Sequence, residues 1–351
     1  MFLFKKKKEV IGIDIGSSSV KLVQLKDNKG SLQLLHAAII PLPPEAIVDN
    51  TLMDSSSVAA VVKNLVTSLG IKVKEVACSI SGNSVIIRKI VLPAMPQEEL
   101  EDQISWEAEQ YIPFDINDVN MDFQILSPDS SDPSKMNVLL VASKKDIIND
   151  YVSVFNEAGL HLSVVDVDSF AVQNAFEANY TCGPEDILAL INIGASVMNI
   201  NIIKDGKTLF TRDVQMGGNL YTEEIQKQLG LSSDDAETAK KLAHATHNDA
   251  LIHAIGKVNE TITQEIRRSL DFYNSTANDE RIRSVFLSGG CSKVYNLIAA
   301  ISEKIGLPVD TLNPFAELTI NEKDFDPEYL QEIGPLMAVP VGLAIRRSGD
   351  K

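Results

Sequence analysis

The chain has 351 residues, of which 44% are hydrophobic and 23% are charged, so it is long enough for about two globular domains. It carries 48 acidic and 32 basic side chains, a net charge of −16, which argues against broad binding to nucleic-acid backbones. No hydrophobic run approaches the roughly 18 residues that a membrane-spanning helix needs.

The N-terminal segment MFLFKKKKE places its apolar stretch before its lysines, which is the reverse of a secretory signal. Residues 1–8 are therefore expected to form a basic, solvated extension. Lys5–Lys8 would gain about 1 kcal/mol each near an anionic lipid surface. Such a segment would assist membrane contact without acting as an anchor.

Two stretches of the chain, Val10–Ile40 and Ile187–Val214, follow the same pattern. Each has a β-type run, a turn at Asp-x-Gly or Asn-x-Gly, a second β-type run, a hairpin turn signal and a third run. The copies are offset by 178 residues, as Gly16 and Gly194 show. This predicts a duplicated three-stranded meander, with one copy in each half of the chain.

Helices and strands are expected to follow each meander. In the first half they are a helix over Val58–Leu69, a strand over Glu75–Ile80, a strand over residues 163–168 and a helix over residues 169–178. In the second half they are helices over Thr222–Leu229, Asp235–Ala245 and Ala250–Ser275, a strand over Ser284–Leu287, and helices over Lys293–Ile305 and Leu336–Arg346. A capping box formed by Asp234 and Glu237 is expected to start the second of these helices.

Residues 85–159 interrupt the first half with a strand–helix–strand–strand–helix order, which predicts a small inserted α+β unit. Its clearest loop is SPDSSDPSK, which is rich in Ser, Asp and Pro. Trp106 and Tyr111 lie on the helix of this unit, and we expect them in its core ahead of a role in a peptide-binding groove.

The turns of the two meanders have the composition of phosphate-binding loops. Small residues at 16–19 and at 194–196 leave backbone N–H groups accessible to an anion. Asp14 precedes the first turn, where it could hold water on a Mg²⁺ ion, and Lys21 follows it. LSGGCSK adds a third glycine-rich turn between a strand and a helix. Because no G-x-x-x-x-G-K-[ST] and no helix-opening G-x-G-x-x-G occurs, P-loop and Rossmann sites are excluded.

The full pattern resembles the actin-like ATPase superfamily, in which FtsA and PilM share an insertion in the first half. DIGSSS and NIGAS match the two phosphate loops of the superfamily, and FLSGGCS matches its adenosine loop. The similarity to the PilM family of the type IV pilus machinery is closer and covers nearly the whole chain. It is carried by VIGIDIGSSSVKLVQL, IVLPAMPQEELEDQISWEAEQYIPFDINDVNMDF, VVDVDSFAVQNAF and IGPLMAVPVGLAIRR. The sequence ends at AIRRSGDK, without the C-terminal amphipathic helix usual in FtsA, which also favours the PilM family.

The resemblance implies an α/β, actin-like (ribonuclease-H-like) duplicated fold of two domains with an inserted α+β subdomain. The implied segments are a basic extension (1–8), a first domain core (9–84 and 160–180), the insert (85–159), a second domain (181–333) and a C-terminal helix that returns to the first domain (334–351).

The resemblance also implies that ATP and Mg²⁺ bind between the domains. The implied contacts are Asp14, Gly16, Ser17, Ser18, Ser19 and Lys21 in the first loop; Asn192, Gly194, Ala195 and Ser196 in the second; Gly217 and Gly218 at a helix start; Glu237 and Lys240 near ribose or adenine; and Gly289, Gly290 and Cys291 in the adenosine loop. Asp14 is the residue expected at the metal, and no catalytic residue is assigned.

One position departs from the superfamily pattern. Active members usually have Asp where this chain has Asn192, and the neutral amide is neither a general base nor a good Mg²⁺ ligand. We therefore expect ATP binding with slow or absent hydrolysis, and whether the protein is an enzyme stays open.

For function, the resemblance implies a cytoplasmic platform protein that is peripherally associated with the inner membrane. Its implied partner is the cytoplasmic N-terminal tail of PilN, docked between the first domain and the insert, with PilO and the motor ATPases reached indirectly. No nucleic-acid partner is expected, and membrane contact is expected mainly through partners. Two alternatives are a filament-forming division protein like FtsA and a small-molecule kinase that uses Asp166 or Asp168 as its base.

Overall fold

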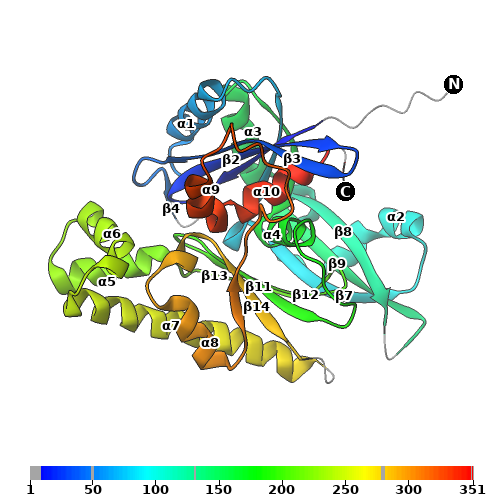
Figure 1. The fold of residues 1–351 in the computed structure, drawn as a ribbon. Coiled ribbons are helices and arrows are strands. Elements are labelled where there is room, and N and C mark those ends of the chain that lie inside the picture. Colours follow the sequence, from blue (N-terminus) through cyan, green and yellow to red (C-terminus); the bar gives the residue numbers. More distant parts are fainter. Residues whose placement is uncertain (1–8, 49–50, 130–131, 278–280, 349, 351) are drawn as a thin grey trace.

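Two five-stranded sheets with the same strand order organise the molecule (Figure 1). The computed structural model describes residues 9–48, 51–129, 132–277, 281–348 and 350, so the expected extension over residues 1–8 lies outside the described residues. The first sheet has the order β3–β2–β1–β6–β10, and the second has the order β13–β12–β11–β14–β15. In each sheet the first three strands form an antiparallel meander, and the last two run parallel to the first strand. The predicted duplication is confirmed.

The strands of the two sheets are as follows. The first sheet contains β1 (Ile11–Ile15), β2 (Ser19–Asn28), β3 (Ser31–Pro41), β6 (Glu75–Ile80) and β10 (His161–Val167). The second contains β11 (Ile187–Ile193), β12 (Met198–Lys204), β13 (Lys207–Val214), β14 (Ser284–Ser288) and β15 (Val309–Thr311). All five residues of β1 are buried, as expected for a central strand that is covered on both faces.

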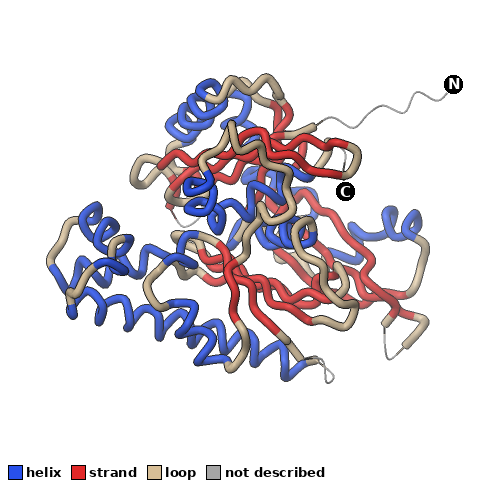
Figure 2. Tube along the Cα trace, in the orientation of Figure 1, coloured by secondary structure: helices blue, strands red, loops and turns tan. Residues whose placement is uncertain are grey.

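Helices cover the outer faces of both sheets and fill the space between them (Figure 2). On the first sheet, α1 (Ser55–Ser68) packs beside α3 (Lys145–Glu157). The layer between the sheets contains α4 (Asp168–Glu177) and α10 (Ala338–Ile345), which pack closely against each other. A side chain at Gly342 would overlap the backbone of Ala171, so this close approach requires glycine.

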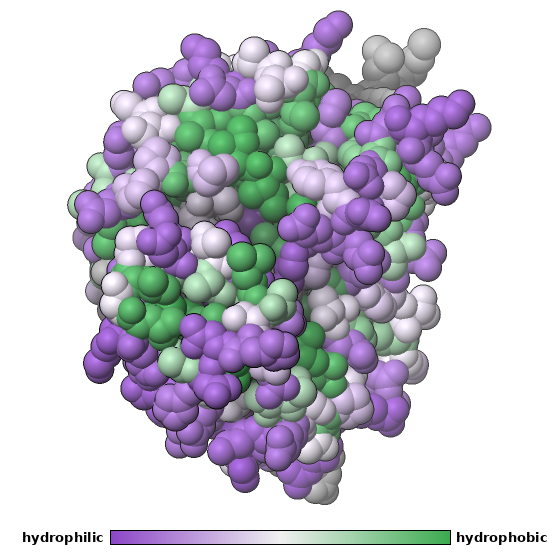
Figure 3. Space-filling model, turned by 60° about the vertical axis from the view of Figure 1, so that its left-hand side comes forward, coloured by the Kyte–Doolittle hydropathy of each residue, from purple (hydrophilic) through white to green (hydrophobic). Residues whose placement is uncertain are grey.

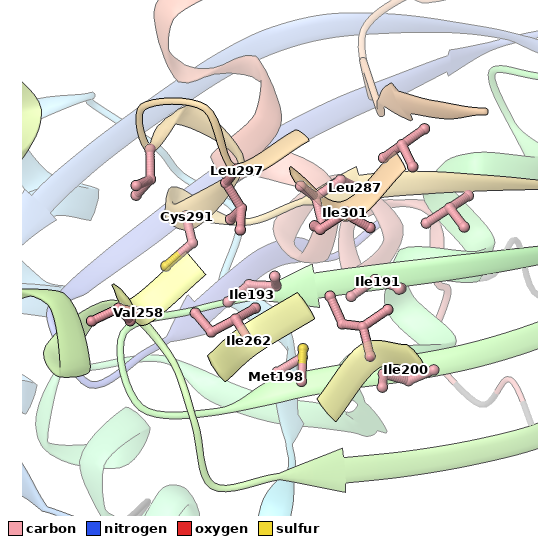
Figure 4. Close-up of a cluster of buried hydrophobic side chains, with 14 of the residues drawn as sticks. Ile191, Ile193, Met198, Ile200, Val258, Ile262, Leu287, Cys291, Leu297 and Ile301 are labelled. Carbon is pink, nitrogen blue, oxygen red and sulfur yellow. The ribbon is translucent and has the colours of Figure 1, made fainter. Parts of the chain in front are cut away.

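The second sheet is covered on its outer face by the long helix α7 (Asp249–Thr276) and by α8 (Leu297–Ile305). Helix α5 (Gly218–Leu229) packs on α7, α6 (Ser233–Lys241) packs on α5, and α9 (Pro327–Ile333) precedes α10. Figure 4 shows apolar side chains of β11 and β12 meeting those of α7 and α8. Burial of each large aliphatic side chain in such a core contributes about 1.5–3 kcal/mol.

The insert is a separate small layer at the right of Figure 1. Strands β7 (Ile86–Pro93), β8 (Val119–Pro128) and β9 (Lys135–Lys144) form an antiparallel sheet of order β7–β9–β8, on which α2 (Gln97–Ala108) packs. The core of this unit contains only its own residues. The expected core positions of Trp106 and Tyr111 are wrong, because these residues are 77% and 37% exposed.

The last helix of the predicted insert belongs by its packing to the first domain. Tyr151, Val154 and Phe155 of α3 are buried in the same cluster as side chains of α1 and β1. The inserted sheet with α2 therefore spans residues 86–144, and α3 carries the chain back onto the first sheet.

Two predicted helix boundaries are wrong for local reasons. Helix α6 ends at Lys241, and its cap is Ser232, whose hydroxyl oxygen accepts from the Asp235 N–H at 3.2 Å, so the expected Asp234–Glu237 capping box does not form. Helix α8 begins at Leu297, four residues after the predicted start, because residues 290–293 form a separate 3₁₀ turn.

The small strands β4 (Ile47–Val48) and β5 (Thr51–Leu52) pair with each other near the first meander. On the face drawn in Figure 3, hydrophobic patches are interrupted by hydrophilic side chains. Among the described residues, no helix has both the length and the apolar character needed to cross a membrane.

Candidate functional site

A cleft of about 760 Å³, open to solvent, lies where the turns of the two meanders approach each other. Both β1–β2 and β11–β12 turns contribute to its wall, and so does the glycine-rich turn after β14. The predicted site residues that line it are Asp14, Gly16, Ser17, Ser18, Lys21, Asn192, Gly194, Ala195, Ser196, Gly289 and Gly290. Residues that are far apart in the chain are thus gathered around one cleft.

The first loop leaves two backbone donors available. The Gly16 N–H donates to the Ser19 carbonyl at 3.1 Å, which closes the turn. Among the hydrogen bonds of the described residues, none uses the N–H groups of Ser17 or Ser18. Ser19 itself begins β2 and is buried, so it shapes the turn from behind. Two unused N–H groups at a cavity wall form a small anion-binding concavity.

The second loop repeats this geometry. The Gly194 N–H donates to the Val197 carbonyl at 2.9 Å, which matches the Gly16 bond in position. Within the described part of the chain, the N–H groups of Ala195 and Ser196 have no hydrogen-bond acceptor. The cleft therefore presents a pair of free N–H groups from each domain.

Gly217 and Gly218 lie behind the second loop instead of in the cleft wall. The Gly218 N–H donates to the Gly194 carbonyl at 2.9 Å, and the Asn219 N–H donates to the Ala195 carbonyl at the same distance. The first N–H groups of α5 thus hold the loop in place. A Cβ atom at Gly217 would lie 2.5 Å from the Gly194 oxygen, so this contact needs glycine.

The third turn brings glycine against the second loop. Gly289 has a φ angle of +83°, which disfavours side-chain-bearing residues, and a Cβ there would lie 2.4 Å from the Ile193 oxygen. Cys291 lies at the edge of the buried cluster in Figure 4, with 3% exposure, and its Sγ is 3.4 Å from the Gly194 oxygen. Burial raises the pKa of its thiol to about 12, so Cys291 supports the loop as a neutral side chain.

Glu237 and Lys240 form a network on α6 and α5, outside the cleft wall. The Lys240 ammonium donates to the Gly218 carbonyl and to the Thr222 hydroxyl, both at 3.1 Å, and it is paired with Glu237. Although burial opposes ionisation, contacts from Lys240 and Thr222 lower the pKa of Glu237. This network ties α6 to the helix that holds the second loop.

The two meanders carry different polar pairs at equivalent positions. In the first, Asp14 and Lys21 face each other across β1 and β2 and form an ion pair at 2.8 Å. In the second, Asn192 and Asn199 occupy the same register across β11 and β12, and Asn192 Nδ2 donates to Asn199 Oδ1 at 3.0 Å. The offset of 178 residues holds for both members of each pair.

Two further aspartates share the cleft region. Burial, followed by the charge of Asp14, raises the pKa of Asp168 to about 7, although Ser79 and Ser81 donate to it and oppose the rise. Burial also raises the pKa of Asp213, which accepts from Asn199 at 2.8 Å. Of these aspartates, Asp14 and Asp168 line the cleft, where a carboxylate suits a cation or a metal-bound nucleotide.

Sequence reasoning missed several lining residues. Ser79 and Ser81 come at and just after the end of β6, and Tyr151 comes from α3. The carboxyl ends of parallel strands commonly form sites, so the position of Ser79 and Ser81 was a usable signal. Tyr151 carries no such signal, because its place depends on how α3 packs.

The two candidate bases of the kinase alternative separate in the structure. Asp168 lines the cleft, whereas Asp166 is buried outside the cleft wall and pairs with Arg346 at 3.1 Å. Only Asp168 is placed to act on a molecule in the cleft.

The donor set fits a Mg²⁺-bound polyphosphate. Free N–H groups on both loops suit phosphate oxygens, and Lys21 supplies a cation. Among the described residues, no group of three or more His, Cys, Asp or Glu side chains is arranged to hold a metal ion. A Mg²⁺ ion would therefore rely on phosphate and water, with Asp14 as the expected protein contact.

The sequence matches the profile of the family described as type IV pilus assembly protein PilM over residues 12–348. The solved structure of a PilM–PilN type IV pilus biogenesis complex superposes with a TM-score of 0.88 at 31% identity, covering 97% of this chain and 99% of that one. Cell division protein FtsA of Bacillus subtilis is 22% identical over 268 residues, which is 68% of this chain and 59% of FtsA. The matched region is thus less than two thirds of that relative's length.

More distant structures share the fold alone. EutJ of Carboxydothermus hydrogenoformans superposes with a TM-score of 0.59 at 15% identity, covering 97% of this chain and 90% of EutJ. MreB5 of Spiroplasma citri, solved with ADP, superposes with a TM-score of 0.52 at 13% identity, covering 95% and 94%. With the duplicated sheets and the inserted sheet, these matches confirm the actin-like fold. The chain belongs to the PilM family of type IV pilus assembly proteins.

Proposed function

We propose that this protein is the ATP-binding cytoplasmic component of a type IV pilus assembly platform and binds the cytoplasmic N-terminal tail of PilN. The observation that carries the proposal is its likeness, over nearly the whole chain, to the PilM of a PilM–PilN complex. Through that tail the protein would link the inner-membrane complex to the pilus motor. Its place would be cytoplasmic and peripheral to the inner membrane, with PilO and the motor ATPases as indirect partners.

ATP with Mg²⁺ is the proposed ligand of the cleft. Support comes from the two facing loops with free N–H groups, from Lys21 and from Asp14 and Asp168 in the cleft wall. The glycines behind the loops and the network of Glu237 and Lys240 hold this geometry. ATP bound with Mg²⁺ supplies a polyphosphate whose charge is partly neutralised, which suits a cleft that already contains aspartates.

Hydrolysis is proposed to be slow or absent. Asn192 offers no base in the second loop, and its amide is engaged by Asn199. Asp168 lines the cleft with a pKa raised to about 7, so it is the candidate general base that remains. We expect single-turnover hydrolysis well below the rate of roughly 1 s⁻¹ that marks the low end of typical enzymes.

The inserted sheet is the proposed receiving surface for the PilN tail, together with the adjacent face of the first domain. An extended peptide needs a groove with apolar pockets, and the insert would supply one wall. Exposed aromatic side chains on this unit, Trp106 and Phe114, give it contact area beyond its own core.

A replacement of residues 86–144 by a short glycine–serine linker tests this assignment. The ends lie close together because Ile86 pairs with Ala142, and the insert core is self-contained, so the remaining domains should fold. A deletion to residue 159 would instead remove Tyr151 and Phe155 from the first core. The variant should lose binding of a synthetic PilN tail peptide and keep wild-type ATP–Mg²⁺ affinity, both measured by calorimetry.

Retention of tail binding by this variant would refute the placement of the tail on the insert. Loss of both ligands with an unchanged melting temperature would refute the separation of the two sites.

A further inference from the structure

The inserted sheet is joined to the first domain by two connections, and both reach the cleft. Ser81 and Ser84 lie on the incoming connection between β6 and β7, and both line the cavity. Tyr151 lies on α3, which follows β9 without an intervening loop, and it lines the same cavity. The cleft wall thus includes residues of the incoming connection and a residue of the helix that follows the insert.

The two connections are fastened to each other and to the insert. The Ser143 hydroxyl at the end of β9 donates to the Ser84 carbonyl at 2.7 Å. The Lys145 ammonium at the start of α3 donates to the Asn117 carbonyl at 2.6 Å. The Lys144 ammonium lies 4.1 Å from the centre of the Phe114 ring, a cation–π contact. The start of α3 is therefore held to the insert by side-chain contacts as well as by the chain.

The second domain also holds the incoming connection. The Gly82 N–H donates to Asp213 Oδ2 at 2.6 Å, and Asp213 Oδ1 accepts from Asn199, which binds Asn192. A continuous set of hydrogen bonds therefore runs from Asn192, beside the second loop, to Gly82 on the incoming connection. We call this connection, residues 81–85, the root of the insert.

Tyr151 has a hydroxyl without a protein partner at the cavity wall. Its side chain is 7% exposed and packs in the core of the first domain. Among the described residues, no hydrogen bond involves its hydroxyl, and the hydroxyl oxygen is not one of the fully buried atoms without a partner, which fits a hydroxyl that reaches the cavity. Burial and the negative charges of Asp168 and Asp14 hold its pKa well above the ordinary value, so it remains an O–H donor.

We propose that Tyr151 donates a hydrogen bond to a phosphate oxygen of the bound nucleotide and thereby couples occupancy of the cleft to the position of the insert. The inference rests on the proposed binding of ATP and Mg²⁺. Among the described residues the hydroxyl makes no hydrogen bond to Asp14 or Asp168, so an oxygen of a ligand in the cleft can accept from it. Because α3 is fixed to the insert at Lys145, ordering of Tyr151 by a ligand restrains the insert at that end.

The coupling has a thermodynamic consequence at the partner surface. If ATP–Mg²⁺ changes the affinity of the insert for a peptide by some factor, the peptide changes the affinity for ATP–Mg²⁺ by the same factor. The affinity of the insert for the peptide changes only if the nucleotide binds two arrangements of the insert with different affinities. The Tyr151 contact provides that difference, since it exists in one arrangement and not in the other.

The substitution Tyr151→Phe tests the proposal because it removes only the hydroxyl. The melting temperature without nucleotide should stay at the wild-type value, as no intramolecular hydrogen bond is lost. Affinity for ATP–Mg²⁺, measured by calorimetry, should fall roughly 10- to 100-fold, the loss expected for one hydrogen bond to a charged group. Tyr329→Phe on α9, outside the cleft, is the matched control and should bind as wild type does.

Hydrogen exchange supplies a readout of coupling that needs no partner. In the wild type, saturating ATP–Mg²⁺ should slow amide exchange in β7 and β9, and in Tyr151→Phe at equal saturation this slowing should be lost. Wild-type affinity and exchange in Tyr151→Phe would overturn this inference alone. Failure of the wild type to bind ATP–Mg²⁺ would overturn the proposed function as well, so the two failures are distinguishable.

Discussion

Asp14 and Asn192 occupy equivalent positions, and the exchange of a carboxylate for an amide decides what each can do. Asp14 forms an ion pair with Lys21, whereas Asn192 enters an amide pair with Asn199. The sequence predicts the exchange, because the repeat aligns the two residues. It does not predict the chain of contacts beyond Asn199, since Asp213 reaches that site only through the pairing of β12 with β13.

The raised pKa of Asp168 predicts a pH-dependent cost in stability. A carboxyl with a pKa near 7 in the folded protein and near 4 when unfolded destabilises the fold increasingly as pH rises from about 4 to 7, and fully above 7. Asp168→Asn, without nucleotide, should raise the free energy of unfolding by roughly 1–3 kcal/mol at pH 8, given about 1.4 kcal/mol per pKa unit. The gain should nearly vanish at pH 4.5. Urea unfolding at both pH values measures it.

The exposed Asp310 supplies the control, Asp310→Asn, for which no such pH-dependent gain is expected. Equal stability of wild type and Asp168→Asn at pH 8 would show that the charge of Asp168 costs nothing. Asp14 and Asp213 share the site, so the measurement reports the cost of the whole acidic cluster, relieved at one position.

At the scale of elements, the sequence predicts the strands of the meanders more accurately than it predicts the ends of the helices. The meanders were predicted because alternating apolar residues and turn signals are local, and the Asp205–Gly206 hairpin turn has the positive φ angles that such signals indicate. The sequence predicts the order of the strands and helix in the insert. It does not show that α3 packs on the first domain, because packing partners are not visible in one sequence. The cap of α6 was missed because Ser232 and Asp234 both satisfy the local pattern.

The second loop depends on the start of α5, and a glycine-to-alanine pair tests this. Gly217→Ala would place a methyl group 2.5 Å from the Gly194 oxygen, and the overpacking should cost roughly 1–3 kcal/mol of stability and weaken ATP–Mg²⁺ binding. Gly256→Ala, in α7 with no atom within 4 Å of the added Cβ, should instead stabilise by roughly 0.5–1 kcal/mol. Chemical unfolding and calorimetry compare the two.

An unchanged stability in Gly217→Ala would show that the loop can move away from α5 at little cost. Its carbonyls would then not depend on the N–H groups of Gly218 and Asn219, and the supporting role given to this helix start would be wrong.

At the scale of the whole molecule, the duplicated fold places one loop from each sheet on either side of a cleft. The layer of α4 and α10 joins the two sheets (Figure 1). The insert forms a separate unit, and Ser81 and Ser84 of its incoming connection line the cleft. The cleft could be predicted from the repeat, whereas the attachment of the insert to its wall could not. That attachment depends on contacts between Ser143 and Ser84 and between Gly82 and Asp213, which follow from tertiary packing.

The most direct test is a calorimetric titration of the protein with a synthetic peptide of the cytoplasmic N-terminal tail of PilN, the proposed partner, with and without ATP–Mg²⁺. The account predicts saturable binding of one peptide per chain, with an affinity that differs between the two conditions. Absence of saturable binding in both conditions, by protein that melts cooperatively, would contradict it.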